Sequence, residues 1–183
     1  MRKYNKGKKF WISFMGNSPL ASLNCIWLAY ERDNFLPDKV VYFATPTAKK
    51  QLELYMPAFK DFFTAIRSEN TNNEAEDTIV IVEISETVGL SMLIDEFSNK
   101  ITECKNEGIV AVDVTPGRKI MSIAALEGAK RAQADKIYYL HLLDESYRDL
   151  LVDEIPCVLQ TLYLIDKEGK TKLLRCEKNV DSR

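Results

Sequence analysis

Histidine and cysteine are scarce in this sequence. His141 is the only histidine, and the four cysteines, Cys25, Cys104, Cys157 and Cys176, form no CxxC pair. Zinc motifs use closely spaced cysteines and histidines, so this pattern speaks against zinc, and we expect no metal site. Widely spaced cysteines are typical of reduced thiols in a cytoplasmic protein, and the cytoplasm is the location we expect.

A large net charge and a long apolar run are also missing. The formal net charge is -2 at pH 7, which does not suit a surface that coats nucleic acid, so we expect no DNA binding. No stretch approaches the length of about 18 apolar residues that spans a membrane, and no secretory signal is visible. Any anion site must therefore be local.

Established cofactor and catalytic motifs are absent as well. The sequence has no GxGxxG after its first apolar run, no GxxxxGKS/T and no GxSxG. We therefore expect no dinucleotide cofactor, no Walker-type phosphate loop and no hydrolase nucleophile turn. Ser-His-Asp chemistry would need His141, which stands in an apolar stretch and is better explained as a core or strand-end residue.

Short apolar runs rich in Val, Ile, Phe and Tyr alternate with stretches of helical length. The runs span 9–15, 39–45, 78–84, 108–114 and 136–143. This alternation predicts right-handed crossovers and an α/β fold, a Rossmann-like, doubly wound, mainly parallel sheet. After residue 143 the alternation stops, and two runs flanking 167–170 predict a C-terminal antiparallel hairpin.

The stretches between the runs predict four helices. They span 18–33, 47–68, 90–108 and 119–135. Pro57 lies inside the second, where we expect a kink or a break. Residues 1–8 form a basic tail, and 9–183 form a single domain with an acidic, Asn-rich loop at 68–77.

Small and hydroxylated residues follow the first four apolar runs. They are Gly16, Asn17, Ser18, Thr45, Ser85, Thr115 and Gly117. Ligands of open parallel sheets bind at the carboxyl ends of the strands, and helix N-termini there favour phosphate. Arg118 and Lys119 add full positive charges at the fourth exit. Each residue alone fits a turn or a cap, but their conjunction predicts a phosphate-containing ligand.

Two segments, FWISFMGNSPLAS (10–22) and VAVDVTPGRKIMSIAA (110–125), resemble the CRISPR-associated Rossmann-fold family, the CARF domains. In that family the fourth strand is followed by a pattern close to D-x-T-G-G-x-K-x-M. The matching residues here are Asp113, Thr115, Gly117, Lys119 and Met121. Pro116 replaces the first glycine of the usual pair. The resemblance covers about residues 9–165 and makes 9–183 a CARF-like domain.

The resemblance implies a homodimer that binds a cyclic oligoadenylate, most often cyclic tetra-adenylate, on its two-fold axis in type III CRISPR antiviral signalling. It implies that Gly16, Asn17 and Ser18 contact the ligand, and that Thr115, Gly117, Arg118 and Lys119 hold phosphate and ribose. Topology alone adds Thr45 and Ser85. Replacing Lys119 by alanine is expected to weaken binding strongly and to leave the fold intact.

Three alternatives stay open. A metal-independent ring nuclease would cleave the same ligand to a 2′,3′-cyclic phosphate, with Lys119 stabilising charge and Ser18 or Asn17 orienting the 2′-hydroxyl. A sensor part of an inner-membrane effector would use the basic start as the flank of a trimmed membrane helix. A generic α/β nucleotide-binding protein would bind one mononucleotide per chain. Arg131 is too far from His141 for the R-x4-6-H ribonuclease motif.

Overall fold

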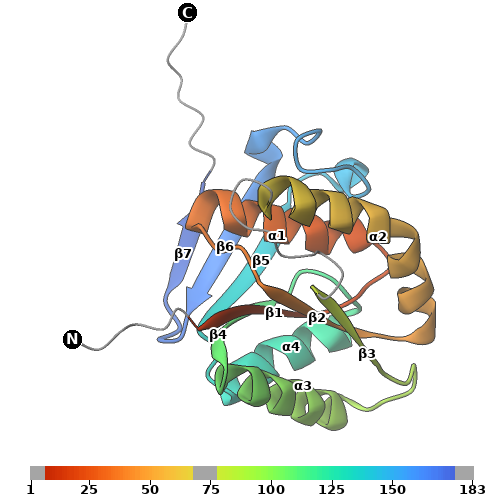
Figure 1. Cartoon of the computed structure of the whole chain (residues 1–183), viewed down its shortest axis with the longest axis vertical. Helices are drawn as coiled ribbons and strands as arrows, with labels where there is room; N and C mark the ends of the chain where they lie inside the picture. Colours follow the sequence, from red (N-terminus) through yellow and green to blue (C-terminus); the bar gives the residue numbers. More distant parts are fainter. Residues whose placement is uncertain (1–6, 68–77, 176–183) are drawn as a thin grey trace, which may run out of the picture.

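The computed structural model describes residues 7–67 and 78–175. The basic run at 1–6, the Asn-rich run at 68–77 and Cys176 therefore lie outside the described residues. The described strands form one sheet in the order β3-β2-β1-β4-β5-β6-β7 (Figure 1). The strands are β1 (Lys8–Phe14), β2 (Lys39–Ala44), β3 (Ile79–Glu83), β4 (Gly108–Asp113), β5 (Lys136–Leu142), β6 (Gln160–Asp166) and β7 (Thr171–Leu174).

Within the described ranges, four α-helices connect or cover these strands. They are α1 (Pro19–Asp33), α2 (Pro46–Arg67), α3 (Leu90–Lys105) and α4 (Lys119–Arg131). Strands β1 to β5 pair in parallel, whereas β5, β6 and β7 pair antiparallel. The predicted Rossmann-like sheet with its C-terminal hairpin is confirmed. Between β5 and β6, the 143–159 segment contains two single-turn helices, η2 (Glu145–Tyr147) and η3 (Cys157–Leu159).

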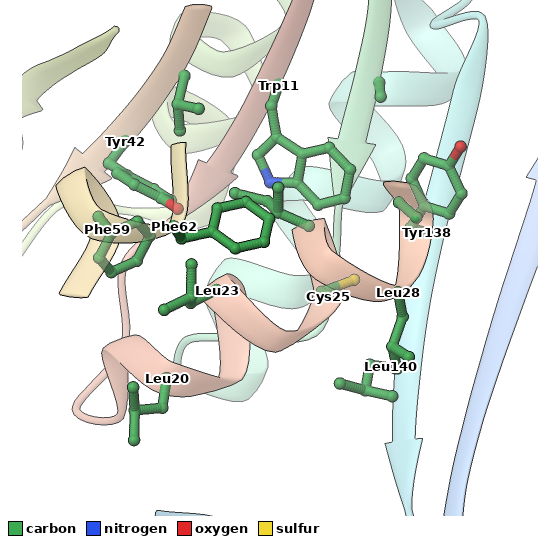
Figure 2. Close-up of a cluster of buried hydrophobic side chains, with 14 of the residues drawn as sticks. Trp11, Leu20, Leu23, Cys25, Leu28, Tyr42, Phe59, Phe62, Tyr138 and Leu140 are labelled. Carbon is green, nitrogen blue, oxygen red and sulfur yellow. The ribbon is translucent and has the colours of Figure 1, made fainter. Parts of the chain in front are cut away.

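The helices form two layers that enclose the sheet, with α1 and α2 on one face and α3 and α4 on the other (Figure 1). Strand side chains alternate between the two faces, so each central strand must be apolar along its whole length. Trp11, Tyr42 and Tyr138 point toward α1 and α2, where Leu23 and Leu28 pack against them (Figure 2). This alternation explains why the apolar runs in the sequence are continuous.

The opposite face is built around stacked phenylalanines. Phe97 of α3 is fully buried, and its ring stacks on that of Phe14 with 4.7 Å between centroids. Ala124 and Ala125 of α4 are buried in the same cluster, where small side chains let the helix approach the sheet closely. Both faces of β1 and β4 are therefore covered, which fixes the loops that follow these strands.

Beyond β5 the α4 side of the sheet is more open. Tyr139 pairs with Tyr163 across β5 and β6, and Tyr163 pairs with Leu173 across β6 and β7. Tyr139 and Leu173 are 39% and 37% exposed, and Ile123 on α4 is 50% exposed. We call the three neighbouring strand residues Tyr139, Tyr163 and Leu173 the open apolar face.

The sequence raised two expectations that bear on single residues, one about Pro57 and one about the cysteines. Helix α2 runs as one helix from Pro46 through Pro57 to Arg67, so Pro57 does not break it. Phe59, Phe62 and Phe63 belong to this helix and are buried in the core, and their packing offsets the backbone hydrogen bond that proline removes. Cys157 is disulfide-bonded, whereas Cys25 and Cys104 are free thiols, so the expectation that the cysteines are all reduced is wrong. Widely spaced cysteines can pair when the fold brings them together, which spacing alone does not reveal.

Among residues 7–67 and 78–175, no helix combines the length and the hydropathy needed to cross a membrane.

Candidate functional site

A cavity of about 700 Å³ lies where several strands end. Its walls come from the loops after β1, β2 and β4, the end of β5, and the 143–159 segment. The predicted residues that line it are Gly16, Asn17, Ser18, Thr45, Thr115, Gly117 and Arg118. Ser85 and Lys119 are not among the lining residues. The structure thus brings together seven of the nine residues predicted to bind ligand.

The loops after β1 and β4 touch at two glycines. A Cβ atom built on Gly16 would lie 2.6 Å from the backbone nitrogen of Gly117, closer than real Cβ contacts come. Gly117 itself has a φ of 103°, in the region that favours glycine. These two residues therefore set the spacing of the cavity floor.

Replacing Gly16 by alanine is expected to force the two loops apart and to destabilise the fold by about 1–3 kcal/mol. Thermal or urea unfolding measures this change. The control is Gly89→Ala, because a Cβ at Gly89 meets nothing within 4 Å. Gly89 is the N-cap residue of α3, where alanine is less favourable than glycine, so we expect that control to lose no more than about 1 kcal/mol. Equal stability of the two variants would show that the glycine contact is not restrictive.

Ser18 and Thr45 stand at the starts of α1 and α2, and their hydroxyls are used differently. The Ser18 hydroxyl lies 3.3 Å from the carbonyl oxygen of Arg148 and 3.2 Å from Oδ1 of Asp149, so it contacts the 143–159 segment. It makes no capping bond to α1. Thr45 is buried, and its Oγ1 accepts a hydrogen bond of 3.3 Å from the Ala48 amide at the start of α2.

The fourth exit carries the charged groups. Arg118 is the N-cap residue of α4, and its Nη2 donates a 3.3 Å hydrogen bond to the carbonyl oxygen of Glu86 in the next loop. Its guanidinium therefore bridges two of the loops around the cavity. Lys119 is the first residue of α4 and is exposed outside the cavity. Ser85 is exposed, and its hydroxyl contacts that of Thr87 at 3.1 Å.

Asp113 lies beneath the cavity and positions its floor. Its Oδ1 accepts a 2.8 Å hydrogen bond from the Thr115 amide, and the Ser22 hydroxyl donates to Oδ2 at 3.4 Å. The Thr115 hydroxyl accepts from the Leu140 amide at 2.8 Å and contacts Cys25 Sγ at 3.7 Å. This network fixes Thr115 between β4 and β5.

Burial dominates the protonation of this network. Desolvation raises the pKa of Asp113 to about 7, although hydrogen bonds from Thr115, Cys25 and Ser22 oppose the rise. Desolvation also raises the pKa of the Cys25 thiol well above its usual value, with the nearby Asp113 charge adding to it. Neither Asp113 nor Cys25 lines the cavity. Both therefore affect its shape only through Thr115, which they contact.

The structure adds lining residues that sequence reasoning missed. His141 lines the cavity at the end of β5, beside Tyr139, whose Oη lies 3.5 Å from His141 Nδ1. The sequence indicated this only through the position of His141 near the end of an apolar run, since residues at the ends of the other runs were predicted to bind ligand. Arg148 lines the cavity from the 143–159 segment, where no motif marks it.

The cavity wall carries charges of both signs. Arg118 and Arg148 supply two cations, and Glu86 and Glu145 supply two carboxylates. Arg148 is exposed and loosely paired, with 3.9 Å to Glu145 and 4.0 Å to Asp149. Long, exposed ion pairs of this kind contribute little stability, so the Arg148 side chain is free to reorient toward an anion.

Comparison with known proteins finds solved structures with a similar fold. No family model matches the chain, and no curated protein matches it. One similar structure is Can2 from Sulfobacillus thermosulfidooxidans in complex with cyclic tetra-adenylate, with a TM-score of 0.53 and 14% identity over 91% of this chain. Another is Csm6 from Enterococcus italicus bound to cyclic hexa-2′-fluoro-hexa-dAMP, with a TM-score of 0.48 and 18% identity over 78% of this chain.

The chain spans 37% of the length of each of these two proteins. The similarity to Can2 concerns the fold, since the identity is 14%. The resemblance to CARF domains seen in the sequence is thereby confirmed at the level of the fold.

Proposed function

We propose that this chain binds a cyclic oligoadenylate, with cyclic tetra-adenylate as the first candidate, as a receiver in type III CRISPR antiviral signalling. The supporting observation is the convergence of three strand-exit loops, the start of α1 and Arg118 on one cavity. Backbone amides at a helix start and a guanidinium are the groups that bind phosphodiesters. Can2, which has a similar fold, is seen in complex with cyclic tetra-adenylate, and for this reason that ring is the first ligand to test.

A homodimer is part of the proposal. Tyr139 belongs to both the cavity and the open apolar face, so a second copy seated on that face would extend the cavity. Two-fold symmetry would then present Arg118 and Arg148 twice, giving four cations to a ring with four phosphates. A symmetric ligand meets the same groups from each copy.

Calorimetric titration with cyclic tetra-adenylate, combined with light scattering for mass, tests this function. We expect one ring per two chains. Cyclic hexa-adenylate and AMP are titrated in parallel, because a larger ring would change only the ligand size. One AMP per chain and no ring binding would favour the generic nucleotide-binding alternative and contradict the proposal.

Ring cleavage is the second candidate function, and the position of His141 favours it. Imidazole is the side chain that most often transfers protons near neutral pH. As the base, His141 would take the proton of a ribose 2′-hydroxyl. The 2′-oxygen would form a bond to the adjacent phosphorus while the bond from phosphorus to the 5′-oxygen breaks. The 5′-oxygen then receives a proton, leaving a 2′,3′-cyclic phosphate and a 5′-hydroxyl. Arg118, rather than Lys119, would stabilise the developing charge.

His141→Gln is expected to slow the rate at which linear products form by about 100-fold or more. The affinity for the ring should change only a few fold. Single-turnover assays with labelled cyclic tetra-adenylate in a chelator measure the cleavage, and titration measures the affinity. Cleavage at the parent rate in this variant would remove His141 from the reaction. Binding without cleavage in the parent would leave the chain as a sensor.

A further inference from the structure

Aromatic rings gather on the wall of the cavity that β5 forms. Tyr139 and His141 are two residues apart on this strand, so they lie on the same face of the sheet, and both line the cavity. Tyr139 Oη lies 3.5 Å from His141 Nδ1, and the centroids of the two rings are 6.1 Å apart. Tyr147 adds a third lining ring from the 143–159 segment. This wall therefore offers flat ring surfaces to a ligand.

Tyr139 differs in exposure from the tyrosines that build the core of the sheet. Tyr42 and Tyr138 are fully buried, whereas Tyr139 is 39% exposed. Tyr163 stands opposite Tyr139 on β6, and the two rings stack with 6.1 Å between centroids and 23° between planes. Tyr163 thus supports the Tyr139 ring from β6 without covering it. A ring that is held in place but left open to solvent is available to stack on a flat partner.

The loop that carries Arg118 is held against the same strand. Thr115 follows β4, and its hydroxyl accepts a 2.8 Å hydrogen bond from the amide of Leu140, the residue after Tyr139. Arg118 ends this loop, and it lines the cavity as Tyr139 does. Neighbouring elements therefore present a guanidinium and an aromatic ring to one cavity. This pair of groups suits a nucleotide, which joins an anionic phosphate to a flat base.

We propose that Tyr139 is a stacking platform for one adenine base of the ring in each chain, an inference that rests on the proposed function. The base lies flat on the phenol ring, and Arg118 holds the neighbouring phosphate. Every base has a π face, so Tyr139 contributes affinity and orientation and does not select the base. Tyr139 also belongs to the open apolar face, so in the homodimer the stacked base lies at the junction between the two copies.

The test uses cyclic tetra-adenylate in which 2-aminopurine replaces one adenine, because stacking on an aromatic ring quenches the fluorescence of this base. Titration with the parent is expected to lower the fluorescence. Tyr139→Leu keeps an apolar side chain but removes the ring, and it is expected to raise Kd by about tenfold or more and to reduce the quench at saturating protein. Tyr139→Phe keeps the ring and loses only the contact of the hydroxyl with His141. It is expected to retain the quench and to bind within a few fold of the parent.

The matched control is Tyr30→Leu, the same chemical change in α1 at a position outside the cavity lining. This variant is expected to keep the Kd and the quench of the parent. An unchanged quench in Tyr139→Leu at saturating protein would overturn the platform and leave the proposed function intact. A loss of dimer mass in light scattering that accompanies the loss of affinity would assign Tyr139 to the contact between copies and would also overturn it. Failure of the parent to bind any adenylate ring would overturn the platform and the proposed function together.

Discussion

Replacing Arg118 by alanine is expected to weaken binding of cyclic tetra-adenylate by about 100-fold or more. A hydrogen-bonded charge pair with phosphate is worth about 1.5–3 kcal/mol, and a homodimer would lose two of them. Arg118 is exposed at the start of α4, so its loss should not disturb the core. Anisotropy of a labelled ring gives Kd, and circular dichroism confirms that the fold remains.

The decisive comparison is with Lys119→Ala. The sequence motif predicts a strong effect at Lys119, but the structure places this residue outside the cavity lining, whereas Arg118 lies within it. We therefore expect the lysine variant to lose less than about tenfold. A larger loss at Lys119 than at Arg118 would restore the sequence-based assignment. Parent-like binding by Arg118→Ala would mean that the anion is held elsewhere.

Replacing Asp113 by asparagine is expected to stabilise the protein above pH 7 by a few kcal/mol. The pKa of Asp113 is about 7 in the fold, against about 4 for an ordinary aspartate. Between these values the folded state binds more protons than the unfolded state, so stability falls as pH rises from 4 to 7 and then levels off. Asparagine stays neutral, and its Oδ1 can still accept from the Thr115 amide.

Urea unfolding of parent and variant between pH 4 and 8 measures this effect. The difference between the two curves isolates Asp113 from the other titrating groups, because those are unchanged. It should grow with pH and level off near neutrality. Cys25 and Tyr42 lie nearby, but burial raises the pKa of both, so they stay neutral in this range. A difference that is constant with pH would show that the pKa of Asp113 is the same in the folded and the unfolded state, which contradicts the expected rise.

The sequence was sufficient for the architecture because burial on both faces of β1, β2 and β4 leaves continuous apolar runs. It also located the exits at Gly16 and Thr115, since small residues follow those runs directly. It did not distinguish Arg118 from Lys119. The two are adjacent, and the direction of a side chain at a helix start depends on the preceding loop, here the turn at Gly117.

The residues that line the cavity near the end of β5 could not be predicted from the sequence, for a different reason. His141 stands in an apolar stretch, and its strand-end position alone does not separate a cavity residue from a core residue. Asn24 lies in the middle of α1, and Gln160 begins β6; they meet the same segment because the chain turns back over α1 between residues 143 and 159. Contacts of such long range depend on tertiary packing.

The sheet order has a consequence for how the chain is made. The central strand β1 pairs with β2 on one side and with β4 on the other, and residue Ser13 aligns with Asp113. During synthesis β1 emerges long before β4, so one edge of an apolar strand stays unpaired while about a hundred residues are added. Chains halted before residue 108 would carry this open edge and be prone to aggregate.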